Sequence, residues 1–241
     1  MQAPPAREPT SVAGIARGEM SALFVSPIGW VVAGLFVFLV SGFGFIGTVL
    51  AGQQATMVGA FDVITGFLVV LLIPVLTMRP IAAERSRARD WELVVGKWLG
   101  VFAVYVLLVA ATSVYVVLFA IYVPDRGALD LGLLASTYIG LLLVGATAIA
   151  IGVLASTVTA SRVVAYLVSV LGLVVIWYAT FGVGLVAAPS LLPFFDYIAA
   201  YNRYQSFSLG LLSLRDAVYF ASIAVASLFI TTRVLGARRW R

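Results

Sequence analysis

Residues 98–124 read WLGVFAVYVLLVAATSVYVVLFAIYVP, a run without a single charged side chain. About 20 apolar residues, each rising ~1.5 Å along a helix, cross the ~30 Å hydrocarbon core of a bilayer. This run therefore predicts a membrane-spanning helix. The whole chain agrees, because 63% of it is hydrophobic and only 10% is charged, against about 25% charged residues in soluble domains. We expect an all-α, polytopic integral membrane protein.

Five further apolar runs flank this one and predict six transmembrane helices in total. Residues 1–28 are expected to form a cytoplasmic tail with an interfacial amphipathic helix, and residues 29–241 a six-helix transmembrane domain. Asp62 and Arg79 bracket the short second run and are expected at the two membrane interfaces. The predicted spans cover residues 29–50, 61–78, 98–122, 132–156, 164–184 and 216–234.

The distribution of basic residues tests the number of predicted spans and indicates how the chain is oriented in the membrane. With the N-terminus in the cytoplasm, Arg126, Arg203 and Arg215 are the only cations on the outer side, and 12 of the 15 lie inside. This asymmetry is typical of helical membrane proteins and places both termini in the cytoplasm of a multi-pass cell-membrane protein. The inner set comprises Arg7, Arg17, Arg79, Arg85, Arg87, Arg89, Lys97, Arg162, Arg233, Arg238, Arg239 and Arg241.

Two segments are not expected to span. Residues 11–30 mix apolar side chains with Arg17 and Glu19, which favours an interfacial helix that turns into the membrane at Pro27. Residues 185–215 carry aromatic side chains at helical spacing, which favours short helices in the outer leaflet between spans five and six. A seventh span there is the alternative, but it would bury Asp196 and Arg203 at mid-membrane.

The composition excludes several kinds of chemistry. The chain has no histidine and no cysteine, so the commonest general base and the commonest metal ligands are missing, and we expect no metal site and no catalytic residues. It has no G-x-x-x-x-G-K-[ST] motif, so it does not bind ATP through a P-loop. The net charge of +5 is explained by the basic residues that orient the chain in the membrane. We therefore expect no nucleic-acid partner.

Charge is concentrated in one place, RPIAAERSRARDWELVVGK, residues 79–97. Together with the preceding LIPVLTM (72–78), the opening SPIGWVVAGLFVFLVSGF (26–43) and the final RYQSFSLGLLSLRDAVYFASIAVASLFITTRVLGARRW (203–240), it resembles the permease subunit of ABC-2 type transporters. Within that group the chain is similar to the gliding-motility and nitrous-oxide-reductase-maturation type permeases. The resemblance covers most of the chain.

The resemblance implies a second permease chain and a separate ABC ATP-binding subunit, which would carry ATP and Mg. The loop between spans two and three would help to receive that subunit, because charged rims orient soluble partners. Trp91 is the strongest single candidate. The alternative is that the arginines here only fix topology and bind lipid headgroups. The candidate docking residues are Glu84, Arg85, Arg87, Arg89, Asp90, Trp91 and Glu92.

One departure from the family concerns this loop. After the arginines the family usually continues with a GT-x-E-L-L-L-T-x-P-V-like stretch, whereas here the chain runs directly into RDWE. Either the docking element is shortened, or docking shifts to the N-terminal helix, or this chain is the non-canonical half of a heteromeric assembly.

The motif SLRDAVYF opens the sixth span. Arg215 and Asp216 are expected to pair at the outer mouth and, with Arg203, to form an outer gate. The alternative is an interface anchor in which Asp216 favours the start of the helix.

Three functions remain open from the sequence. The first is the permease subunit of an ATP-driven transporter. The second is a membrane scaffold of an ATPase complex that moves no solute, and the third is a secondary carrier or channel. No carboxylate falls in the middle of a span, which disfavours a proton-coupled carrier.

Overall fold

The computed structural model describes residues 11–51, 58–79, 89–122, 130–159, 161–178 and 192–239. Within these ranges the chain is almost entirely helical and contains no strand. The first half comprises α1 (Val12–Val25), α2 (Pro27–Leu39), the π-helix η1 (Val40–Ala51), α3 (Val58–Val63), the π-helix η2 (Ile64–Val69), α4 (Val70–Thr77), α5 (Asp90–Ala111) and α6 (Ser113–Tyr122). The second half comprises α7 (Leu131–Val158), α8 (Arg162–Trp177), α10 (Leu192–Ile198), α11 (Ala200–Ser208) and α12 (Leu214–Arg239).

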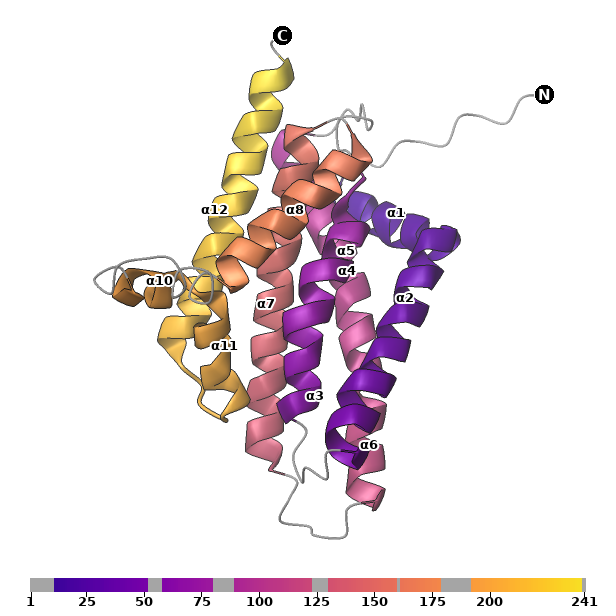
Figure 1. Ribbon diagram of the computed structural model, residues 1–241. Coiled ribbons are helices and arrows are strands. Elements are labelled where there is room, and N and C mark those ends of the chain that lie inside the picture. The colour runs from indigo at the N-terminus through magenta and orange to yellow at the C-terminus, as the bar shows by residue number, and fades with distance from the viewer. Residues whose placement is uncertain are drawn as a thin grey trace, which may run out of the picture.

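Helix α7 lies at the centre of the bundle, between α12 and α11 on one side and α5 and α4 on the other (Figure 1). In its most apolar window 67% of the residues are buried, against 22–28% in the three other long apolar helices. Small residues make this possible, because they let neighbouring helices approach closely. A Cβ atom at Gly145 would lie 2.0 Å from the ring of Tyr105 on α5. Only glycine allows that contact.

Hydroxyl groups on α7 bind the backbones of its neighbours. Thr147 donates to the carbonyl of Phe220 on α12 at 3.0 Å, and Ser136 donates to the carbonyl of Phe207 on α11 at 2.7 Å. Such interhelical hydrogen bonds hold helices together where no water competes for them. The central helix is therefore fixed to both α11 and α12.

Four helices in the described part of the chain are long and apolar enough to cross a membrane. They cover Pro27–Gly47, Asp90–Ile121, Leu131–Val158 and Leu214–Ala237, and their mean hydropathies are 1.7–2.5. Helices on the outside of the bundle carry exposed apolar side chains, such as Trp30 on α2, Leu171 on α8 and Phe229 on α12. Surfaces of this kind are solvated by lipid or by a partner, so the helices indicate a membrane-embedded protein.

The predicted second and fifth spans take a different form. The second is a helix interrupted by π-helical turns, from Val58 to Thr77. The fifth is α8, which has 16 residues, and the rest of the predicted span, from residue 179, lies outside the described residues. Two short helices, α10 and α11, are found where the sequence predicted short helices before the last span. They lie beside the bundle and not across its end (Figure 1).

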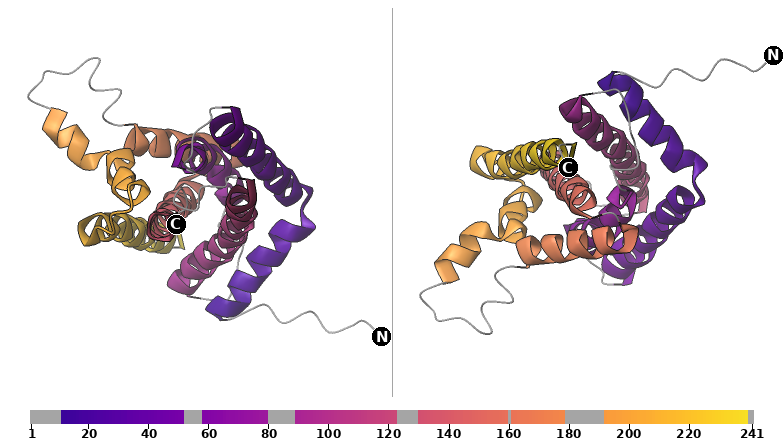
Figure 2. Two further views of the ribbon diagram at one scale, coloured as in Figure 1. Left: turned by 90° about the horizontal axis from the view of Figure 1, so that it is seen from below. Right: turned by 90° about the horizontal axis from the view of Figure 1, so that it is seen from above.

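Helix α1 lies along the edge of the bundle and packs against α5, as the two end-on views in Figure 2 show. Ser11 caps it by accepting a hydrogen bond from the amide of Gly14. It ends at Val25, and α2 begins at Pro27, where the sequence predicted the turn. The start of α1 and the end of α12 lie at the same end of the bundle (Figure 1).

Candidate functional site

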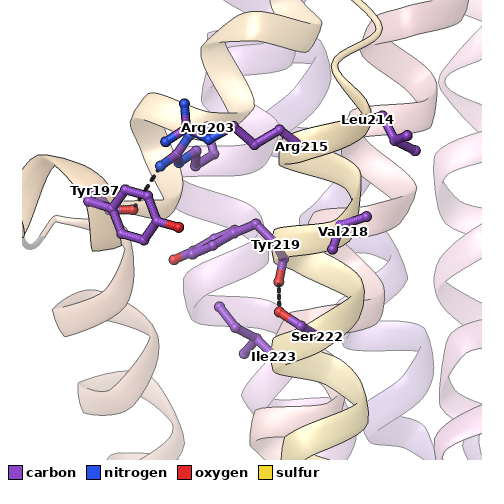
Figure 3. A pocket seen from close by; sticks show the side chains of 8 residues that line it. All are labelled: Tyr197, Arg203, Leu214, Arg215, Val218, Tyr219, Ser222 and Ile223. Carbon is purple, nitrogen blue, oxygen red and sulfur yellow. Dashed lines mark hydrogen bonds between the residues drawn. The ribbon is translucent and has the colours of Figure 1, made fainter.

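A pocket of about 550 Å³ lies between α10 and α12 (Figure 3). Arg203 and Arg215 lie at one end of it, and Ser222 and Ile223 at the other. The remaining lining residues are Tyr197, Leu214, Val218 and Tyr219. The pocket therefore joins a cationic, aromatic end to an apolar wall, and it contains two of the three predicted outer-gate residues.

Arg203 on α11 is held by two partners. Its Nη1 atom donates to Oδ1 of Asp216 on α12 at 3.1 Å, and its Nη2 atom donates to the carbonyl of Tyr197 on α10 at 3.3 Å. The two charged side chains are 13% and 5% exposed. This ion pair is shielded from solvent and ties three helices together.

The predicted ion pair between Arg215 and Asp216 is wrong. Consecutive residues on a helix point about 100° apart, so the two side chains leave α12 in different directions. Asp216 is buried against α11, whereas Arg215 is exposed. The structure places Arg203, Arg215 and Asp216 close together, but the ion pair joins Arg203 to Asp216.

Aromatic rings surround the cationic end of the pocket. The guanidinium carbon of Arg203 lies 4.7 Å from the centre of the Tyr197 ring and 5.7 Å from that of Tyr219. Arg215 lies 5.4 Å from the centre of the same Tyr197 ring. The hydroxyl of Tyr219 donates to the carbonyl of Ile198. Cation–π contacts of this kind hold guanidinium groups in place where water is scarce.

Local sequence explains this arrangement. Gly210 has a φ of +84°, which glycine adopts without strain, and this turn reverses the chain between α11 and α12. Ser213 then accepts a hydrogen bond from the amide of Asp216. Arg215 and Tyr219 are four residues apart, so they share one face of α12. That spacing was the signal by which the sequence could have placed Tyr219 in the site.

The candidate docking residues lie elsewhere, at the start of α5. Of the seven, Glu84, Arg85 and Arg87 lie outside the described residues. The prediction that Asp90, Trp91 and Glu92 lie in a loop is wrong, because they form the first turn of α5. The carboxylate of Glu92 accepts a hydrogen bond from the amide of Arg89 at 2.8 Å, which stabilises that first turn. Asp90 lies against α12 at Gly236.

Trp91 is 49% exposed at this end of the bundle. Trp91 is the second residue of α5, between Arg89 and Glu92, which form the capping hydrogen bond. An exposed tryptophan flanked by charged side chains matches the composition of protein–protein contacts.

A buried junction between α1 and α5 was not predicted. Nζ of Lys97 lies 3.7 Å from Oε1 of Glu19, and the two side chains are 1% and 5% exposed. Lys97 also donates to the carbonyl of Arg79, whose own side chain donates to the carbonyl of Ala22 at 3.4 Å. The α1–α5 junction, formed by Glu19, Ala22, Arg79 and Lys97, therefore joins α1, the residues after α4, and α5.

The sequence held one hint of this junction. Lys97 is the last cation before the long uncharged run, and Glu19 is the sole carboxylate in α1. Both are unusual beside apolar neighbours, but residues so far apart in sequence could not be paired without the fold.

In the part of the chain that the structure describes, no three carboxylates come together as a metal site. Comparison of the sequence with models of known protein families and with curated proteins finds no match.

Proposed function

We propose that this chain is the membrane permease subunit of an ABC-2 type transporter, driven by a separate ATP-binding chain. The observation that carries the proposal is the exposed Trp91 at the capped start of α5, within the stretch that resembles the family. This chain has no P-loop of its own. ATP and Mg would therefore bind the partner, and a second permease chain would complete the pathway.

The proposed topology has six crossings with both termini in the cytoplasm. The alternating directions of the long helices and the shared end of α1 and α12 support it (Figure 1). The distribution of basic residues, 12 against 3, supports a cytoplasmic location for that end. In this arrangement Trp91 faces the cytosol, α1 lies at the inner interface, and α10 and α11 lie in the outer half of the membrane.

The α1–α5 junction supplies a route for coupling. A partner that moves the segment between α4 and α5 acts on Arg79 at one end of that segment and on Asp90 at the other. Arg79 contacts both Lys97 and Ala22, so such a movement reaches α1 as well as α5. Nucleotide-driven closure of the ATP-binding chains would shift the balance between two arrangements of these helices.

Topology is testable because the chain has no cysteine. Ser86→Cys lies in the proposed cytoplasmic segment and Ala128→Cys in a proposed outer loop. A membrane-impermeant maleimide should label Ala128→Cys in intact cells, and Ser86→Cys only in inverted vesicles. Labelling of Ser86→Cys from outside intact cells would disprove the topology and the docking together.

Measurement of ATPase activity tests whether an ATP-binding subunit associates with this chain. The purified complex should hydrolyse ATP, and Trp91→Ala should lower the amount of ATPase subunit retained, whereas Trp30→Ala on the lipid-facing surface should not. If no ATP-hydrolysing subunit is retained and the chain alone conducts in liposomes, the function is that of a carrier or channel. If the complex hydrolyses ATP but moves no solute, the function is that of a scaffold.

A further inference from the structure

The pocket between α10 and α12 carries an excess of positive charge. The guanidinium groups of Arg203 and Arg215 both lie within 5.4 Å of the centre of the Tyr197 ring. Asp216 neutralises Arg203 through the 3.1 Å ion pair. Asp196, the carboxylate next to Tyr197 in sequence, is exposed, accepts a hydrogen bond from Asn202 and does not line the pocket. One positive charge is left over.

That charge belongs to Arg215. Among the described residues no carboxylate forms an ion pair with it, and its contact there is the face of Tyr197. The Nε atom of Arg203 is also buried without a hydrogen-bond partner. A guanidinium group binds phosphate or carboxylate oxygens through several N–H groups at once. The pocket therefore presents the guanidinium group of Arg215, whose N–H groups form no ion pair with a carboxylate of the described residues.

The other end of the pocket is apolar. Val218 and Ile223 continue the wall away from the arginines, and Val218 is 57% exposed. Beyond the pocket, the exposed residues Val225 and Phe229 follow on α12. A ligand that fits must be anionic at one end and able to extend an apolar chain along this helix.

We propose that this pocket binds the phosphate headgroup of an anionic glycerophospholipid. Arg215 binds the phosphate, because guanidinium N–H groups match phosphate oxygens in geometry and charge. An acyl chain lies along Val218 and Ile223. The volume of about 550 Å³ suits a headgroup and the first part of its chains. The single excess charge selects a headgroup with net negative charge over a zwitterionic one.

This inference needs α12 to lie in the membrane and does not depend on an ATP-binding partner. Free phosphate shares the anionic chemistry of a lipid headgroup, and the two are distinguished by the apolar chain. The test therefore uses the purified chain in detergent and compares three ligands, phosphatidylglycerol, phosphatidylcholine and inorganic phosphate, by native mass spectrometry and thermal stabilisation.

Phosphatidylglycerol should bind and stabilise the chain, and phosphatidylcholine should bind about tenfold more weakly, which corresponds to 1.4 kcal/mol. Arg215→Gln should abolish this preference, and Arg215→Lys should retain part of it. Arg162→Gln, a change of an exposed arginine at the start of α8, is the matched control and should leave binding unchanged.

Val218→Trp fills the apolar wall without touching a charge, so it tests the site even if the Arg215 variants fail to fold. This variant should bind phosphatidylglycerol more weakly. Inorganic phosphate should not stabilise it. Equal binding of both lipids, or an unchanged preference in Arg215→Gln, would overturn the proposal. Inorganic phosphate that displaces phosphatidylglycerol at equal concentration would overturn the lipid assignment and leave a site for free phosphate.

Discussion

Removing one partner of the buried ion pair between Lys97 and Glu19 should destabilise the protein strongly. At 3.7 Å and an effective dielectric constant of about 20, the Coulomb attraction is about 4 kcal/mol. Removing one partner of a buried ion pair costs about 3–5 kcal/mol. Lys97→Met leaves Glu19 charged at 5% exposure, and Glu19→Gln leaves Lys97 charged at 1% exposure. Each variant should therefore lose about 3–5 kcal/mol of the free energy of unfolding.

The double variant Glu19→Gln/Lys97→Met distinguishes this explanation from loss of packing. It removes both charges of this pair, so it should be more stable than either single variant, and the two effects should be non-additive by about 1–3 kcal/mol. Arg17→Gln is the matched control, because Arg17 is an exposed charge on the same helix. We expect it to change stability by less than about 0.5 kcal/mol.

Equilibrium unfolding in mixed micelles with increasing SDS measures these free energies. Tryptophan fluorescence is a suitable signal, because Trp98 lies next to Lys97 and donates to the carbonyl of Ala146 on α7. Additive single effects would refute the argument. So would a double variant that is less stable than both single variants, because then the two side chains contribute separately and not as a pair.

Two further predictions use the same unfolding measurement. Asp216→Asn should lower the free energy of unfolding by about 3 kcal/mol, because it leaves the guanidinium of Arg203 largely buried and uncompensated; an effect below 1 kcal/mol would mean that water or lipid already solvates the group. Gly145→Ala should cost about 1–3 kcal/mol, because its Cβ would lie 2.0 Å from the ring of Tyr105. Gly172→Ala, whose Cβ has no atom nearer than 3.7 Å, is its control, and equal effects of the two glycine changes would contradict the close packing on α7.

The apolar runs predicted the helices because length and hydropathy alone decide whether a segment suits a bilayer. The predicted span over 132–156 corresponds to α7, Leu131–Val158. Helix boundaries were less predictable where charge and helix coincide. The charges of residues 90–97 predict a loop, yet these residues are helical, because Glu92 caps the first turn and Lys97 is buried against Glu19 of α1.

The sequence did not predict which charged side chains form ion pairs. Adjacent Arg215 and Asp216 were expected to pair, but helix geometry directs them apart, and Asp216 finds Arg203 on another helix instead. The partners Glu19 and Lys97 lie on helices that meet only in the fold. Both ion pairs depend on helix packing, which hydropathy patterns do not specify.

The central position of α7 has a mechanical consequence. Its hydroxyl groups donate hydrogen bonds to the backbones of α11 and α12, and Gly145 leaves room for the ring of Tyr105 on α5. Because such close contacts tolerate little sliding, we expect α11 and α12 to move together with α7 in any conformational change. Spin labels on α7 and α12 should then keep a constant separation when the protein changes conformation, and a changed separation would contradict this role of α7.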